Sequence, residues 1–120
     1  MLDKVKEIKK KIGDRLNYKR TYVTHLFNNV GTYIGSHKFE CSPIFLECEM
    51  EDYYKEFFKR MIKDPGIEIS KIGHEYTKLN TDDLISCKHW YSVYKLVVKD
   101  NFKDLKLHYK IYVLDLDKNK

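Results

Sequence analysis

The chain has 120 residues, of which 42% are hydrophobic, 34% charged and 14% aromatic, and its formal net charge is +5. A chain of this size buries roughly two-thirds of the surface that its unfolded form exposes, so this composition excludes a disordered polypeptide and predicts one domain over residues 1–120. The positive charge is carried almost wholly by lysine, since Arg15, Arg20 and Arg60 are the only arginines. Base readout favours arginine, so a sequence-specific DNA reader is not expected. The positive charge leaves open non-specific contact with phosphates or with an acidic protein surface and does not choose between them.

The first half of the chain is predicted to contain one helix followed by extended segments. Residues 2–16 repeat apolar side chains at helical spacing and carry lysines on the other side, as in an amphipathic helix. Residues 18–34 fit a helix by spacing, but their Thr, Tyr and Val content and the turn-forming NNVG segment favour a strand, a turn and a second strand. Residues 37–48 are predicted to be extended, with Pro43 at an edge or bulge and IFLEC (44–48) as a buried strand.

The second half is predicted to hold a second helix and a long β-hairpin. Residues 50–63 are predicted to form a helix with one apolar stripe, made of Met50, Tyr54, Phe57, Phe58, Met61 and Ile62. Pro65 ends that helix. A strand is expected over residues 67–72 and a two-stranded ribbon over residues 90–116. The predicted fold is therefore α+β, with two helices packed on a largely antiparallel sheet that ends in a C-terminal β-hairpin.

The alternation of side chains along this hairpin predicts a two-sided ribbon. One side is apolar and includes Trp90, Tyr94, Leu96 and Ile111. The opposite side gathers the candidate nucleic-acid or partner-binding residues, which are Lys95, Lys99, Lys106, His108 and Lys110, rimmed by Tyr91 and Tyr112. Such a face is able to bind single-stranded nucleic acid, with lysines on phosphates and tyrosines beneath bases. The alternative is that it is only the solvated side of an antiparallel sheet.

An acidic cluster, FLECEMED, is the strongest enzyme-like signal. If residues 44–48 form a strand, Glu47 and Glu49 point the same way and are weak candidates, with Glu40, for holding a divalent metal. The order of helix, strands, IFLECE, helix and strand resembles the core of the PD-(D/E)XK nucleases over residues 2–72. That resemblance implies metal-dependent phosphodiester hydrolysis, although Glu49 stands where those nucleases carry lysine. The alternative is that these acids lead into the start of a helix.

Other constellations predict neither a metal nor a cofactor. Cys41, Cys48 and Cys87 with His37 and His89 lack the paired spacing of zinc ligands, so buried structural cysteines are expected instead. No glycine-rich phosphate loop is present. The odd number of cysteines, the absence of an apolar signal region and the absence of a membrane-length apolar run predict an intracellular, cytoplasmic protein with reduced thiols.

Composition also suggests a source and a class of partner. The chain has no alanine or glutamine and is rich in lysine, isoleucine and tyrosine, which is typical of an AT-rich genome such as that of a phage or mobile element. Because tyrosine-rich surfaces are common at protein interfaces, we expect a non-enzymatic accessory protein that binds a host protein or nucleoprotein complex. Non-specific nucleic-acid binding through the basic face and a metal-dependent nuclease are the alternatives.

Overall fold

The computed structural model describes residues 18–79 and 87–118. Its elements are the strands β1 (Arg20–Asn28) and β2 (Tyr33–Cys41), the short 3-10 helix η1 (Pro43–Phe45), the helix α2 (Leu46–Phe58), and the strands β3 (Pro65–Thr77), β4 (His89–Asp100) and β5 (Leu105–Asp115). The predicted strand, turn and strand over residues 18–34 are thus present as β1 and the start of β2.

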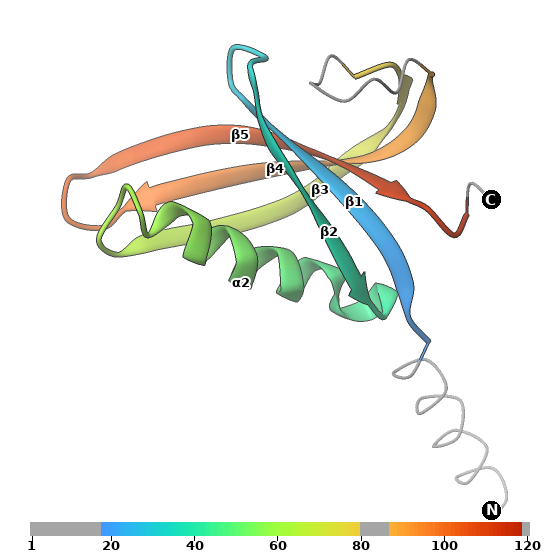
Figure 1. Ribbon diagram of the computed structural model, residues 1–120. Helices are drawn as coiled ribbons and strands as arrows, with labels where there is room; N and C mark the ends of the chain where they lie inside the picture. The colour runs from blue at the N-terminus through green and yellow to red at the C-terminus, as the bar shows by residue number, and fades with distance from the viewer. Residues whose placement is uncertain (1–17, 80–86, 119–120) are drawn as a thin grey trace, which may run out of the picture.

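The five strands form one antiparallel sheet in the order β2-β1-β5-β4-β3 (Figure 1). The predicted α+β class is confirmed, but the predicted pair of helices is not matched. Among the described residues α2 is the only α-helix, and the helix expected over residues 2–16 lies outside them. The ribbon predicted over residues 90–116 is present as the antiparallel pair β4 and β5, but it does not lie at one end of the sheet, because β5 also pairs with β1.

Helix α2 begins earlier than its sequence pattern predicts. Residues 44–48 are not a buried strand: residues 43–45 form η1, and Leu46–Phe58 is helical. The stripe that faces the sheet repeats every fourth residue and consists of Leu46, Met50, Tyr54 and Phe58. Its first member lies within the segment predicted as a strand. Pro43 fits at the start of this helical segment because a first-turn residue needs no N–H donor.

The helix also ends earlier than expected, at Phe58 rather than Lys63. The N–H groups of Met61 and Ile62 both donate to the carbonyl of Phe58 and close the chain into a turn before Pro65. Ile62 remains buried, whereas Met61 is 68% exposed and does not belong to the core stripe. Strand β3 extends well beyond the predicted 67–72 segment, from Pro65 to Thr77.

The core lies between α2 and one face of the sheet. It contains the helix stripe and strand residues of alternating parity, including Tyr22, Leu26, Phe39, Leu96, Val98 and Ile111. Tyr54 is 2% exposed, and its hydroxyl lies 3.0 Å from Oγ1 of Thr24, which is itself fully buried. Oγ1 of Thr24 also donates to the His37 carbonyl at 3.3 Å. A polar link of this kind stabilises the core because each buried hydroxyl has a partner.

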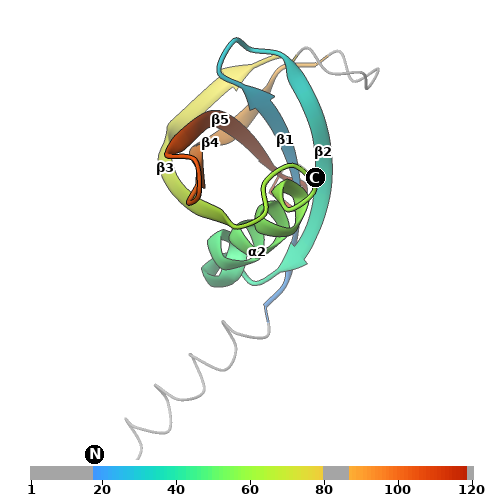
Figure 2. The same cartoon turned by 90° about the vertical axis from the view of Figure 1, so that its left-hand side faces the viewer.

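Twist curls the sheet around the helix. Figure 2 shows the outer strands β2 and β3 passing on either side of α2. In Figure 1 the turn between β1 and β2 and the end of β3 rise at the side of the sheet away from the helix. Right-handed twist accumulates from strand to strand, so a wide sheet cannot remain flat. The face opposite α2 consequently has a raised segment at two of its sides.

The helix does not cover the whole of its own face of the sheet. Trp90 was predicted on the apolar side of the ribbon but is 63% exposed. It packs against Tyr76, which is 53% exposed, at a ring-centroid distance of 5.2 Å.

Within the described part of the chain, no helix has the length and hydrophobicity that a membrane crossing requires.

Candidate functional site: a basic sheet face and the adjoining pocket

The structure brings the five predicted basic side chains together on the face opposite α2. We call Lys95, Lys99, Lys106, His108 and Lys110 the basic face. In the antiparallel register of β4 and β5, Lys95 is directly opposite Lys110, and Lys99 is directly opposite Lys106. The alternation of side chains carries their neighbours Leu96 and Ile111 into the core, where both are fully buried. The parity of the two strands was therefore predicted correctly, while a role in binding stays a prediction.

The basic face places like charges across from one another at two positions. Side chains directly opposite on one face lie close together, and like charges there are destabilising. Glu68, on β3, most directly offsets the Lys99–Lys106 pair, because its Oε1 forms an ion pair with Nζ of Lys99. This hydrogen bond and the charge of Lys99 hold the pKa of Glu68 below its usual value, with smaller contributions from Lys106 and Lys95.

The two tyrosines predicted to rim the face occupy different environments. Tyr91 is only 4% exposed, so its predicted place at the rim is wrong. Its ring packs edge-on against Tyr112 at 5.9 Å and against His25 at 6.2 Å, and burial raises the pKa of its hydroxyl. Tyr112 is half-buried, and its hydroxyl donates to Oε2 of Glu75 at 3.3 Å. Burial, and then the charge of Glu75, raise the pKa of Tyr112.

Burial of Tyr91 follows from an aromatic cluster that sequence reasoning missed. This cluster consists of His25, Phe27, Tyr33, Tyr91 and Tyr112, joined by ring contacts of 5.4 to 6.4 Å. It lies beside the basic face because β5 pairs with β1 as well as with β4. The odd positions of β1 offered a local signal, since His25 and Phe27 alternate with the core residues of that strand. The pairing that makes them neighbours of Tyr112 is not local in sequence.

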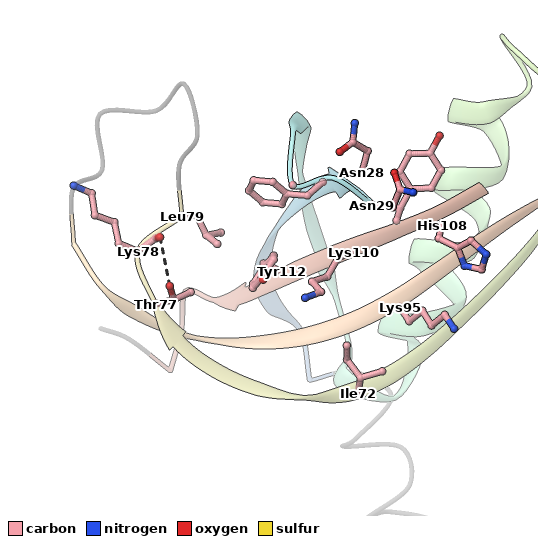
Figure 3. Close-up of a pocket in the computed structure, with 13 residues that line it drawn as sticks. Asn28, Asn29, Ile72, Thr77, Lys78, Leu79, Lys95, His108, Lys110 and Tyr112 are labelled. Atoms are coloured by element: carbon pink, nitrogen blue, oxygen red, sulfur yellow. Dashed lines mark hydrogen bonds between the residues drawn. The ribbon is translucent and has the colours of Figure 1, made fainter. Parts of the chain in front are cut away.

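A pocket of about 520 Å³ lies where the basic face meets the aromatic cluster (Figure 3). Its apolar lining comes from Phe27, Ile72, Leu79 and Tyr112. Its polar lining includes Lys95, His108, Lys110, Asn28 and Asn29. Figure 3 shows labelled side chains from β3, β4 and β5, from the β1–β2 turn and from the residues just after β3 around this space. The volume is within the range of small-molecule sites, roughly 300–1,000 Å³.

The turn at one side of the pocket is held by its own hydrogen bonds. Oδ1 of Asn28 accepts the N–H groups of Val30 at 3.1 Å and Thr32 at 2.8 Å. Gly31 has a φ of 85°, a conformation that glycine adopts without steric cost. Because Oδ1 of Asn28 already accepts two hydrogen bonds, this turn offers a ligand the NH2 donor of Asn28 and the side chain of Asn29.

The acidic candidates for catalysis do not form the arrangement that was predicted. Glu47 and Glu49 lie in the first turn of α2, not on a strand, and Glu40 lies on β2 with an oxygen 3.8 Å from Nζ of Lys38. All three are exposed. Among residues 18–79 and 87–118, no group of three His, Cys, Asp or Glu side chains is placed to hold a metal ion. Acids at a helix start interact favourably with its positive end, which explains the cluster without a metal.

The cysteines are also distributed differently from the expectation. Cys41 is buried, and its pKa is raised by burial and by the charge of Glu49. Cys48 and Cys87 are exposed, so the prediction of buried cysteines holds for Cys41 alone. Cys48 is exposed because it falls between the core positions Leu46 and Met50 on a helix rather than on a buried strand.

No protein-family model matches the chain, and no curated protein or solved structure is significantly similar to it. Function is therefore inferred from the chemistry of the basic face and its pocket.

Proposed function

We propose that this is a non-catalytic binding protein that holds an anionic partner on the basic face. The observation that carries this proposal is that lysines are directly opposed across β4 and β5 at two positions, Lys95 with Lys110 and Lys99 with Lys106. A host protein or nucleoprotein complex, the partner expected from composition, is compatible with such a surface. Both that partner and a cytoplasmic location remain predictions.

Opposed lysines on a sheet face lower the stability of the folded chain, so their presence needs an explanation. A merely solvated sheet face loses nothing by alternating lysine with glutamate or threonine, and opposite charges across strands contribute roughly 0.2–1 kcal/mol of stability. Two opposed lysine pairs instead impose a penalty on the folded chain, which the ion pair of Lys99 with Glu68 reduces at one of them. A bound anion removes that penalty, because its charge lies between two cations that otherwise repel each other. Lys95, Lys106 and Lys110 are all exposed, so a partner reaches them without a change of fold.

A nuclease is less well supported than binding. The resemblance to PD-(D/E)XK enzymes required Glu47 and Glu49 on a strand beside a third acid, and the structure places both on α2. A binding role requires only the lysine arrangement that the register of β4 and β5 provides.

The proposal is tested with a fluorescein-labelled 12-mer of abasic deoxyribose phosphate, an anion without bases. Single-stranded phosphate binding has a log–log salt slope of about −0.7 per neutralised phosphate. Three or four contacts predict roughly a 20- to 50-fold loss of affinity between 50 and 200 mM salt. Fluorescence anisotropy measures the affinity at each salt concentration.

Two charge-matched double variants make the test specific. K95Q/K110Q removes two lysines from the basic face, and K55Q/K59Q removes two exposed lysines from α2 and the residue after it, on the other side of the sheet. Both lower the net charge by two. We expect the first to reduce the salt slope by about 1.4 and the second to leave it unchanged. Equal losses in both variants, or no binding of the oligomer at 50 mM salt, would refute the proposal.

A further inference from the structure

The pocket beside the basic face has the chemistry of a site for a flat ring attached to an anion. Ile72, which is 56% exposed, lines this pocket together with half-buried Leu79 and Tyr112. The cations Lys95 and Lys110 line the same space. Nζ of Lys110 lies 5.9 Å from the ring centroid of Tyr112, so the charge is held against the face of an aromatic wall. An apolar wall and a cationic margin within one pocket suit a ligand that is apolar at one end and anionic at the other.

From this we infer that the anionic partner of the basic face is a single-stranded nucleic acid, one base of which enters the pocket lined by Ile72, Leu79 and Tyr112 while Lys95 and Lys110 bind the adjoining phosphates. This inference rests on the proposed function and names its partner.

The placement of the cations favours this partner over an acidic peptide. Strand register puts Lys95 opposite Lys110 at the pocket and Lys99 opposite Lys106 four residues farther along β4. The cations thus form a track that leads away from the pocket, along which a phosphate backbone can continue. Every unit of a single-stranded nucleic acid carries both a flat base and a phosphate, whereas an acidic peptide offers a flat apolar group to Ile72, Leu79 and Tyr112 only where an aromatic residue interrupts its acids.

The turn between β1 and β2 adds polar groups that suit a base. The amide of Asn28 and the side chain of Asn29 stand at the pocket in a turn fixed by the hydrogen bonds of the Asn28 oxygen. Amide groups hydrogen-bond to the edges of unpaired bases, which are accessible in a single strand and engaged in a duplex. A duplex of the same length is therefore expected to bind more weakly than the single strand.

The experiment compares three labelled probes by fluorescence anisotropy at 150 mM salt: oligothymidylate of 12 residues, the abasic 12-mer and a 12-base-pair duplex. Stacking of one base on a protein side chain changes affinity about 5- to 150-fold. We expect oligothymidylate to bind at least fivefold more tightly than the abasic oligomer, with the duplex weaker than oligothymidylate.

The variant Ile72→Ser removes part of the apolar wall without changing charge. We expect it to abolish most of the preference for oligothymidylate and to leave abasic binding unchanged. Ile44→Ser is the matched control, because Ile44 is also 56% exposed but lies in η1, away from the pocket. It is expected to keep the preference.

The outcomes separate this inference from the proposed function. Equal binding of oligothymidylate and the abasic oligomer, each with a steep salt dependence, would retain the anion site and overturn the base pocket. Displacement of oligothymidylate by poly-glutamate at an equal concentration of charge, or duplex binding as tight as single-strand binding, would also overturn it. Failure of every anion to bind at 50 mM salt would instead refute the proposed function.

Discussion

Substitution of Lys95 by glutamate is expected to stabilise the fold while weakening anion binding. Lys95 is exposed and directly opposite Lys110, so the change replaces repulsion by attraction across the two strands. Each such contact is worth roughly 0.2–1 kcal/mol, and exposed pairs lie at the lower end. Lys95 also attracts Glu68, and the replacement of that attraction by repulsion between two carboxylates offsets part of the gain. We therefore expect a net increase of about 0.5 kcal/mol in the free energy of unfolding, or about 2–3 °C in Tm.

Thermal and urea denaturation followed by circular dichroism at 20 mM salt measure this gain. It should shrink at 1 M salt, where the Debye length is about 3 Å. The neutral variant Lys95→Gln should give a smaller gain than Lys95→Glu. In the anisotropy assay at 50 mM salt, Lys95→Glu should bind the abasic oligomer about tenfold more weakly. A variant that is destabilised at low salt, or that binds as well as the parent, would contradict the idea that repelling lysines are kept for an anion.

Three further predictions concern the same fold. Glu68→Gln releases Lys99 from its ion pair, so it should increase affinity for the abasic oligomer and steepen the salt slope by about 0.7, whereas an unchanged slope would place Lys99 outside the site. Tyr54→Phe should cost about 0.5–1.5 kcal/mol of unfolding free energy. Thr24→Val should cost about 1–3 kcal/mol, because it leaves the buried hydroxyl of Tyr54 without its Thr24 partner. A double-mutant cycle in urea should show that the two losses are non-additive. Burial and the nearby Asp115 raise the pKa of Tyr22 from 10.0 to about 12, so its contribution to stability is complete below pH 10 and is lost as pH rises through 12; Tyr22→Phe should flatten the decline of the urea midpoint over that interval.

The sequence allowed the two faces of β4 and β5 to be predicted because strand side chains alternate with a period of two. Once Leu96 and Ile111 are assigned to the core, the facing positions of Lys95 and Lys110 follow from the pairing of the strands. Patterns of this kind are local, and the structure preserves them.

The start of α2 and the environment of Tyr91 were not predictable in the same way. The IFLEC segment is apolar enough for a buried strand, and only its continuation through Met50 and Tyr54 reveals a stripe with a period of four. Tyr91 is buried because β1 approaches β5 from a distant part of the chain and because the sheet is curved. The pocket depends on the same long-range pairing, so its apolar wall and its cations are dispersed along the sequence.

The position of β5 has a consequence for how the chain folds during synthesis. The register joins Tyr22 to Asp115, so the central strand of the sheet leaves the ribosome after the other four described strands. Until Leu105–Asp115 has emerged, the β1–β2 hairpin and the β3–β4 hairpin have no strand between them, and each presents an unpaired edge. Pairings this distant in sequence slow folding, because a long loop must close before any contact is gained. The nascent chain consequently exposes strand edges with unpaired N–H and C=O groups until β5 inserts and joins the two hairpins into one sheet.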